Sequence, residues 1–147
     1  MLRKNIVFCI LIGTNFTVIG HSTYMHSYEK IFSQKTSITV MKKEIKAIIE
    51  QNGHSANIQD QSGRTLLLYA IETKEPELVS FLIKECHANV TQSGVMKSTL
   101  NNEDEVVLPI EFAKIQLELS KTKDDHDKLK KILHYLKNAQ NNDEILI

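Results

Sequence analysis

The fold of this 147-residue chain is decided by the stretch 56–70, which reads ANIQDQSGRTLLLYA. Asp60 and Gly63 are typical of a tight turn, because an Asp side chain accepts hydrogen bonds from nearby backbone groups and glycine tolerates a left-handed conformation. Thr65 then stands where the N-cap of a helix is expected. The apolar face of that helix would be formed by Leu67, Leu68, Ala70 and Ile71. The stretch therefore predicts a polar turn followed by a helix of about two turns, which ends before Pro76.

Three longer segments carry apolar residues at the spacing of one helix face. These residues are Met41, Ile45, Ile48 and Ile49 in the first segment, Leu78, Val79, Leu82 and Ile83 in the second, and Leu129, Ile132, Leu133 and Leu136 in the third. Gly53 suits a left-handed end of the first helix, and Pro76 suits the first turn of the second. Pro109 opens a further short helix that carries Ala113. Short and long helices therefore alternate along the chain.

The loop that precedes the short helix recurs. Ala88-Asn89-Val90 lies 32 residues after Ala56-Asn57-Ile58, and a period close to 33 is typical of stacked helical repeats. The second copy of the loop is longer by 11 residues before its helix begins. Residues 92–105 are polar and rich in turn-forming residues, so we expect an enlarged, mobile loop there.

Together these features resemble the ankyrin-repeat family, in which an Ala-Asp-Val-Asn loop leads to Asp-x-x-Gly-x-Thr-Pro-Leu-His-x-Ala. The positions that match this motif are Asp60, Gly63, Thr65, Leu67 and Ala70 in the central unit, and Pro109 and Ala113 in the next. Leu66 and Leu68 replace the Pro and the His of the family motif, so packing must substitute for the hydrogen bonds of that His. The resemblance implies an all-α fold, an ankyrin-like stack of about three helix-turn-helix repeats whose outer members are degenerate. Within that family, the chain resembles the short bacterial type that carries a signal peptide and degenerate repeats.

The same resemblance implies a surface for a protein partner, because ankyrin stacks bind through their finger-like loops and the face of their first helices. The implied contact residues are Gln59, Gln61, Ser62, Arg64, Tyr69 and Glu72, with Val95 and Met96 from the insertion. An alternative is that the insertion is a tolerated surface loop without a role in binding.

The first twenty residues have the character of a signal peptide. Arg3 and Lys4 precede the apolar run 6–12, and Val18 and Gly20 suit a cleavage before His21. Cleavage before Thr23 is the alternative, and an uncleaved anchor or a buried first helix are alternatives to any cleavage. The expected organisation is a signal peptide over 1–20, a leader or capping segment over 21–40 with a short helix around Tyr28, repeats over 41–138 and a tail over 139–147.

The composition argues against several other classes of function. Eighteen basic and eighteen acidic residues cancel and tryptophan is absent, which disfavours binding to nucleic acid, and no membrane association is expected after signal cleavage. Cys86 is the only cysteine beyond the signal, so it has no internal disulfide partner. His126 and His134 are eight residues apart, whereas helical metal ligands usually lie three or four apart. We expect no cofactor, no metal and no enzyme activity.

The sequence therefore predicts an exported, monomeric module that binds a protein, either in the periplasm or in a host. Two alternatives stay open. One is a periplasmic helical inhibitor or protector that binds a single endogenous enzyme. The other is a small hydrolase or metal-dependent enzyme that uses His126 or His134.

Overall fold

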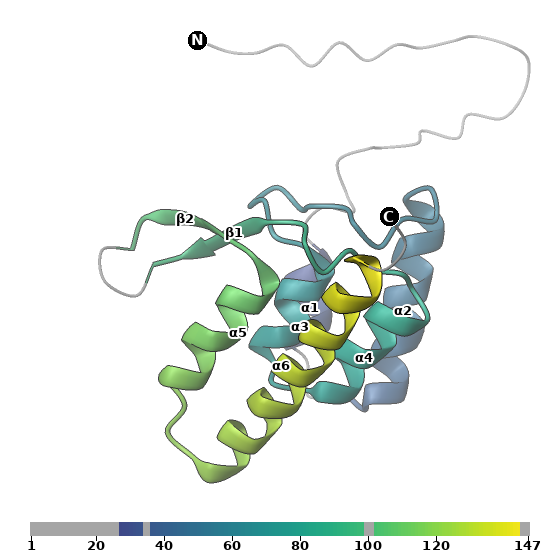
Figure 1. Cartoon of the computed structure of the whole chain (residues 1–147). Coiled ribbons are helices and arrows are strands. Elements are labelled where there is room, and N and C mark those ends of the chain that lie inside the picture. The colour runs from purple at the N-terminus through teal and green to yellow at the C-terminus, as the bar shows by residue number, and fades with distance from the viewer. Residues whose placement is uncertain (1–26, 34–35, 99–101, 145–147) are drawn as a thin grey trace, which may run out of the picture.

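The computed structural model describes residues 27–33, 36–98 and 102–144 and is largely helical, with one small two-stranded sheet (Figure 1). In these ranges the elements are α1 (Ser27–Ser33), α2 (Ile38–Gln51), α3 (Leu66–Glu72), α4 (Pro76–Lys84), β1 (Gly94–Lys97), β2 (Asp104–Val107), α5 (Pro109–Glu118) and α6 (Lys123–Glu144). The expected signal peptide, with Val18 and Gly20, lies outside the described residues, as do the apolar residues 145–147.

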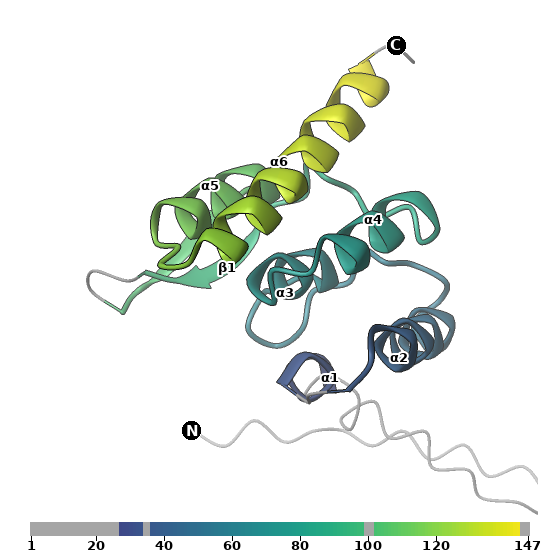
Figure 2. The ribbon, with the colours of Figure 1, turned by 90° about the horizontal axis from the view of Figure 1, so that it is seen from below.

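The helices form three consecutive hairpins that pack side by side. Figure 2 shows α1, α3 and α5 in one row and α2, α4 and α6 in a second row. Each helix contacts its hairpin partner, and α3 and α4 also contact both neighbours in their own rows. The shorter helices of the first row and the longer helices of the second therefore bury apolar faces against one another, as stacked units require.

The helix ends follow from the residues found there. The Ser37 side chain accepts a hydrogen bond from the Val40 N–H, and Gly53 takes a left-handed φ of 76° after α2. Thr65 is the N-cap of α3, as the sequence predicts, and its side chain accepts from the Leu68 N–H. Pro76 and Pro109 stand at the first positions of α4 and α5, where no N–H is needed.

The core runs without interruption through all three hairpins. Its fully buried members come from every longer helix and from the short helices: Ile45, Leu66, Leu67, Leu68, Ile71, Leu78, Val79, Leu82, Phe112, Leu129, Ile132 and Leu136. The apolar positions predicted for the three longer helices lie in this core or pack against it. Burial of these aliphatic faces is the main force that holds the hairpins together.

The two loops that connect the hairpins share several features. His54 and His87 both adopt a left-handed conformation, and each loop then buries a small residue, Ala56 in the first and Ala88 in the second. The Asn89 N–H donates to the Asn57 Oδ1 at 2.7 Å, so the second loop is hydrogen-bonded to the first. The recurrence seen in the sequence therefore corresponds to two loops that stack in space.

Two expectations need correction, and a third is confirmed. The fold is not purely helical, because the insertion forms the antiparallel hairpin β1–β2 with Val95 opposite Val106. The segment counted as a tail from residue 139 continues α6 as far as Glu144. The helix expected around Tyr28 is present as α1, and it lies beside α2 as α3 lies beside α4. Tyr28 and Ile31 are buried in the common core.

Candidate protein-binding surface

Asp60 organises the turn that precedes α3. Its Oδ1 accepts hydrogen bonds from the Ser62 N–H at 2.9 Å and the Arg64 N–H at 3.0 Å, while Gly63 takes a φ of 77°. Its Oδ2 accepts from the Tyr69 hydroxyl at 2.6 Å. Burial acts to raise the pKa of Asp60, but these hydrogen bonds outweigh it and hold the pKa below its usual value. The turn is therefore a rigid support rather than a flexible loop.

Tyr69 does not present its ring to a partner, which corrects one expected contact. It is only 6% exposed, because Phe32 stacks on it at 5.5 Å between ring centroids and Tyr28 approaches edge-on at 6.3 Å. The Arg64 guanidinium also lies 4.2 Å from the ring centre. Burial and the bond to Asp60 raise the pKa of Tyr69 to about 12. This side chain fixes α1 against α3.

The described part of the insertion, β1 and β2, extends the same turn. The Val95 N–H donates to the Gly63 carbonyl at 2.9 Å, so β1 is bonded to the turn on one side and to β2 on the other. Met96 is 6% exposed and belongs to the core, which removes it from the expected contact residues. Val95 is half-buried beside Gly63, whereas its cross-strand neighbour Val106 is 72% exposed.

The hairpin β1–β2 projects from the helices (Figure 1), and β1 is hydrogen-bonded to the turn before α3. We call this part of the molecule the finger surface and define it by Gln61, Ser62, Arg64, Glu72, Val95 and Val106. Arg64 pairs with Glu72 at 2.7 Å across the surface. Gln59, also expected as a contact, is exposed but donates to the Ser93 carbonyl at 2.9 Å and so links the two loops.

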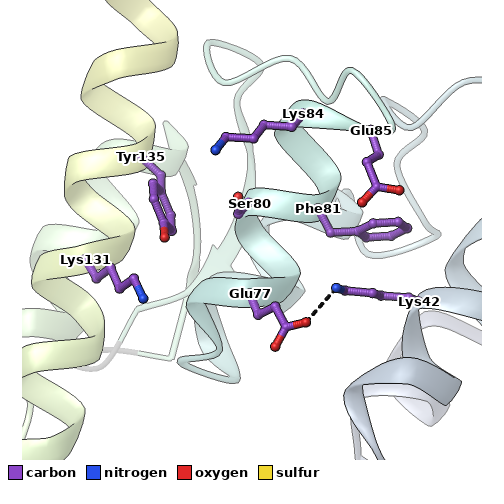
Figure 3. Close-up of a pocket in the computed structure, with 8 residues that line it drawn as sticks. All are labelled: Lys42, Glu77, Ser80, Phe81, Lys84, Glu85, Lys131 and Tyr135. Atoms are coloured by element: carbon purple, nitrogen blue, oxygen red, sulfur yellow. Dashed lines mark hydrogen bonds and ion pairs between the residues drawn. The ribbon is translucent and has the colours of Figure 1, made fainter.

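A shallow groove of about 260 Å³ lies on the opposite row, between α2, α4 and α6. Figure 3 shows Lys84 extending from α4 toward Tyr135 on α6, with Lys131 beside it. Lys42 pairs with Glu77 at 2.7 Å at the other side of the groove. The groove thus contains ammonium groups, the Glu77 and Glu85 carboxylates and the hydroxyl groups of Ser80 and Tyr135, and within the described ranges no hydrogen bond joins Ser80 to a histidine or a carboxylate.

The residues considered for catalysis or metal binding are not brought together. The His126 Nδ1 lies 3.2 Å from the Ser120 hydroxyl oxygen, and the His134 Nε2 lies 3.0 Å from the Asn138 Nδ2. Burial raises the pKa of Cys86, which disfavours its thiolate form. Within the part of the chain that the structure describes, no three potential metal ligands cluster, and no helix has the length and apolar character to cross a bilayer.

Sequence reasoning missed Val106 as a surface residue and missed the groove entirely. The available signal for Val106 was the run Asp104 to Val107, in which an acidic pair precedes two β-branched residues. The groove had no signal, because its lining comes from three helices that are distant in sequence. Comparison of the chain with protein-family models, curated proteins and solved structures gave no match. The protein is therefore described by its fold, which is largely helical with a small, projecting β-hairpin.

Proposed function

We propose that this protein is an exported ankyrin-repeat-like module whose finger surface binds a protein partner. Three hairpins in two rows, with finger-like loops on one edge, are the arrangement that the ankyrin resemblance implies. The observation that carries the proposal is the bond between Val95 and Gly63, which joins the central turn and the β-hairpin into one supported surface. Recognition residues commonly lie on loops held by a rigid scaffold.

The chemistry of this surface suits protein recognition. It combines the partly buried Arg64, whose guanidinium group is planar, with neutral hydrogen-bonding groups at Gln61 and Ser62. The exposed aliphatic side chain of Val106 adds an apolar contact. Interfaces of this kind place an apolar contact inside a polar rim. Lone charged pairs such as Arg64–Glu72 contribute mainly to orientation and specificity.

The test is affinity capture with the chain from residue 21 onward as bait, followed by in vitro binding with the recovered partner. We expect Arg64→Glu to weaken the binding affinity for that partner by about tenfold or more, since an interface arginine is often a hot spot. Lys131→Glu is the matched control, because it makes the same charge change on the opposite row. A partner that tolerates Arg64→Glu and is lost with Lys131→Glu would place binding in the groove and contradict the finger surface.

The nature of the recovered protein separates the alternatives. A single endogenous periplasmic enzyme recovered in stoichiometric amount, with its activity suppressed, would favour the inhibitor or protector. A host protein would favour a host-directed role. The Arg64→Glu variant is informative in either case, because it asks which surface makes the contact.

A further inference from the structure

Among the described residues, the outer edge of β2 carries backbone groups that no other strand satisfies. The Val95 N–H points away from β2, since it donates to the Gly63 carbonyl. In an antiparallel pair, hydrogen-bonded and non-hydrogen-bonded positions alternate, so Val95 and its partner Val106 form a non-hydrogen-bonded pair. The N–H and C=O of Val106 therefore point outward, and those of Asp104, two residues earlier, do the same.

A second observation supports this alternation. The Ser98 N–H donates to the Glu103 carbonyl at 2.8 Å, as expected for a hydrogen-bonded position three residues along β1 from Val95. Among the described residues the sheet has only two strands, with β1 bonded on both sides and β2 bonded on one. The edge from Asp104 to Val106 is thus an unpaired strand edge, which is a template for another strand.

The side chains along this edge select the kind of strand that fits. Val106 is 72% exposed and lies beside Val95 on one face of the ribbon, whereas Glu105 is exposed on the other face. Asp104 pairs with the Lys97 ammonium at 2.6 Å on the face of the ribbon that carries Val106. Glu105 has no ion pair among the residues that the structure describes. The edge is therefore acidic with one apolar position.

The charge on this edge favours a basic strand over a second copy of β2. Two β2 strands that paired antiparallel with Asp104 opposite Val106 would place Glu105 opposite Glu105 of the other copy, and like charges in cross-strand positions are destabilising. A basic strand reverses the sign of this interaction. An aliphatic residue opposite Val106 would extend the apolar face, and a Lys or Arg opposite Glu105 would neutralise it.

We propose that the β2 edge from Asp104 to Val106 binds an extended, basic segment of the protein partner by strand addition. In an antiparallel arrangement, Val106 and Asp104 each exchange two backbone hydrogen bonds with the incoming strand. Affinity then comes from the main chain, and specificity from alternate aliphatic and basic side chains. This inference rests on the proposed binding function and gives its partner a chemical character.

The probe is a synthetic heptapeptide of alternating Lys and Val, with blocked ends, and binding is measured by calorimetry at low salt. We expect measurable binding that weakens with added salt, and no binding of the same peptide with Glu in place of Lys. Two methylated peptides test the strand geometry. Methylation of the Val amides blocks the bonds to β2 and abolishes binding, whereas methylation of the Lys amides places the methyl groups on the far side and preserves it.

Protein variants test the same edge. Val106→Pro removes an N–H that points outward, so the β1–β2 bonds remain while the edge loses a donor, and we expect about tenfold weaker binding. Val106→Thr keeps the N–H and the strand propensity, and we expect it to stay within about threefold. Thermal unfolding confirms that both variants are folded. Glu105→Lys should weaken binding of the Lys-containing peptide and strengthen binding of the peptide that has Glu in place of Lys.

Several results would overturn the inference. These are failure of the basic peptide to bind, equal binding by Val106→Pro and the unmodified protein, or equal binding of the two methylated peptides. Dimerisation of the chain that Val106→Pro disrupts would assign the edge to a second copy. A captured partner that loses binding with Arg64→Glu but keeps it with Val106→Pro and Glu105→Lys would remove this inference while leaving the proposed function in place.

Discussion

The Tyr69 hydroxyl donates a 2.6 Å hydrogen bond to the Asp60 carboxylate, and this bond ties the middle of α3 to the turn that precedes it. The same tyrosine is covered by Phe32 and Tyr28 of α1. One side chain thus links the first hairpin, the second hairpin and the finger surface. Position 68, where the ankyrin motif has a His, is instead a fully buried leucine.

Tyr69→Phe removes this bond while keeping the ring in place. A hydrogen bond to a charged group contributes about 1.5–3 kcal/mol, and the variant leaves the Asp60 oxygen with fewer donors, so we expect the free energy of unfolding to fall by about 2 kcal/mol. Urea unfolding at pH 7 measures this. Tyr135→Phe is the matched control, because the Tyr135 hydroxyl has no hydrogen bond within the described ranges, and its effect should stay below about 0.5 kcal/mol.

Stability should depend on pH at both extremes. The pKa of Tyr69 is raised to about 12 in the folded state by burial and by Asp60, so its contribution is complete below pH 10 and is lost as the pH rises toward 12. Burial also raises the pKa of Tyr28, so this residue contributes to stability with the same dependence on pH. For Asp60 the lowered pKa gives the opposite sign, and its contribution is present above about pH 4 and lost below it.

Unfolding in urea across this pH range tests the assignment. Between pH 10 and pH 12, Tyr69→Phe should remove most of the decline in the free energy of unfolding. The remaining decline comes from Tyr28, whose pKa is also raised. If the variant and the unmodified protein lost stability in parallel above pH 10, Tyr69 would not be the group responsible.

Gly94→Ala tests the close approach of β1 to α3. A Cβ at position 94 would meet the Leu68 side chain and would lie 3.1 Å from the Gly63 carbonyl oxygen. Leu68 is fully buried and cannot move aside freely, so we expect a loss of about 1–3 kcal/mol from overpacking.

Gly53→Ala separates this steric effect from backbone strain. A Cβ at position 53 meets no atom within 4 Å, but Gly53 has a φ of 76° that an alanine adopts only with strain. We expect a loss of about 1 kcal/mol. Gly53→Asn should recover part of that loss, because Asn tolerates the left-handed region, whereas Gly94→Asn should be worse than Gly94→Ala. Equal recovery at both positions would contradict the steric explanation for Gly94.

Thr65→Ala tests the N-cap that the sequence predicted. Thr65 is buried and its hydroxyl oxygen accepts from the Leu68 N–H at 3.3 Å. Loss of a threonine cap costs about 1 kcal/mol, with values up to about 2, and thermal unfolding measures it. Thr65→Ser keeps the acceptor and should lose less than half as much. A Ser variant as unstable as the Ala variant would assign the effect to the threonine methyl group instead.

The proposed export makes a prediction about the N-terminus of the mature chain. When the full sequence is expressed in a bacterium with a secretory pathway, we expect mass spectrometry to find a first residue at His21 or Thr23. Gly20→Leu combined with Ser22→Leu should block both cleavages, because signal peptidase requires small residues before the cut. A cytoplasmic chain that still begins at Met1 would contradict the signal peptide.

Local patterns along the chain were sufficient to predict most of the helices. Thr65, Pro76 and Pro109 act through their own backbone geometry, and the apolar periodicity of α2, α4 and α6 requires no knowledge of a neighbour. The recurrence of the loop after 32 residues was also visible in the sequence, and Ala56 and Ala88 are both buried in the structure.

The contact surface was predicted less well. Tyr69 and Met96 were both expected as contact residues, yet both are buried. Tyr69 is covered by α1, which comes from a segment expected to be a leader, and Met96 is covered because the insertion folds as strands. Neither partner adjoins its target in sequence, so no local pattern could show the contact.

Sequence alone determined where most of the helices begin and that short and long helices alternate, because caps, prolines and apolar spacing act over a few residues. Only the packed molecule decided which side chains remain at the surface. The exposure of Val106, the burial of Tyr69 and the open edge of β2 depend on contacts between residues 30 to 40 positions apart or on hydrogen bonds that point out of the hairpin. Such contacts are set by chain topology, which determines the neighbours that each side chain and each backbone group meets.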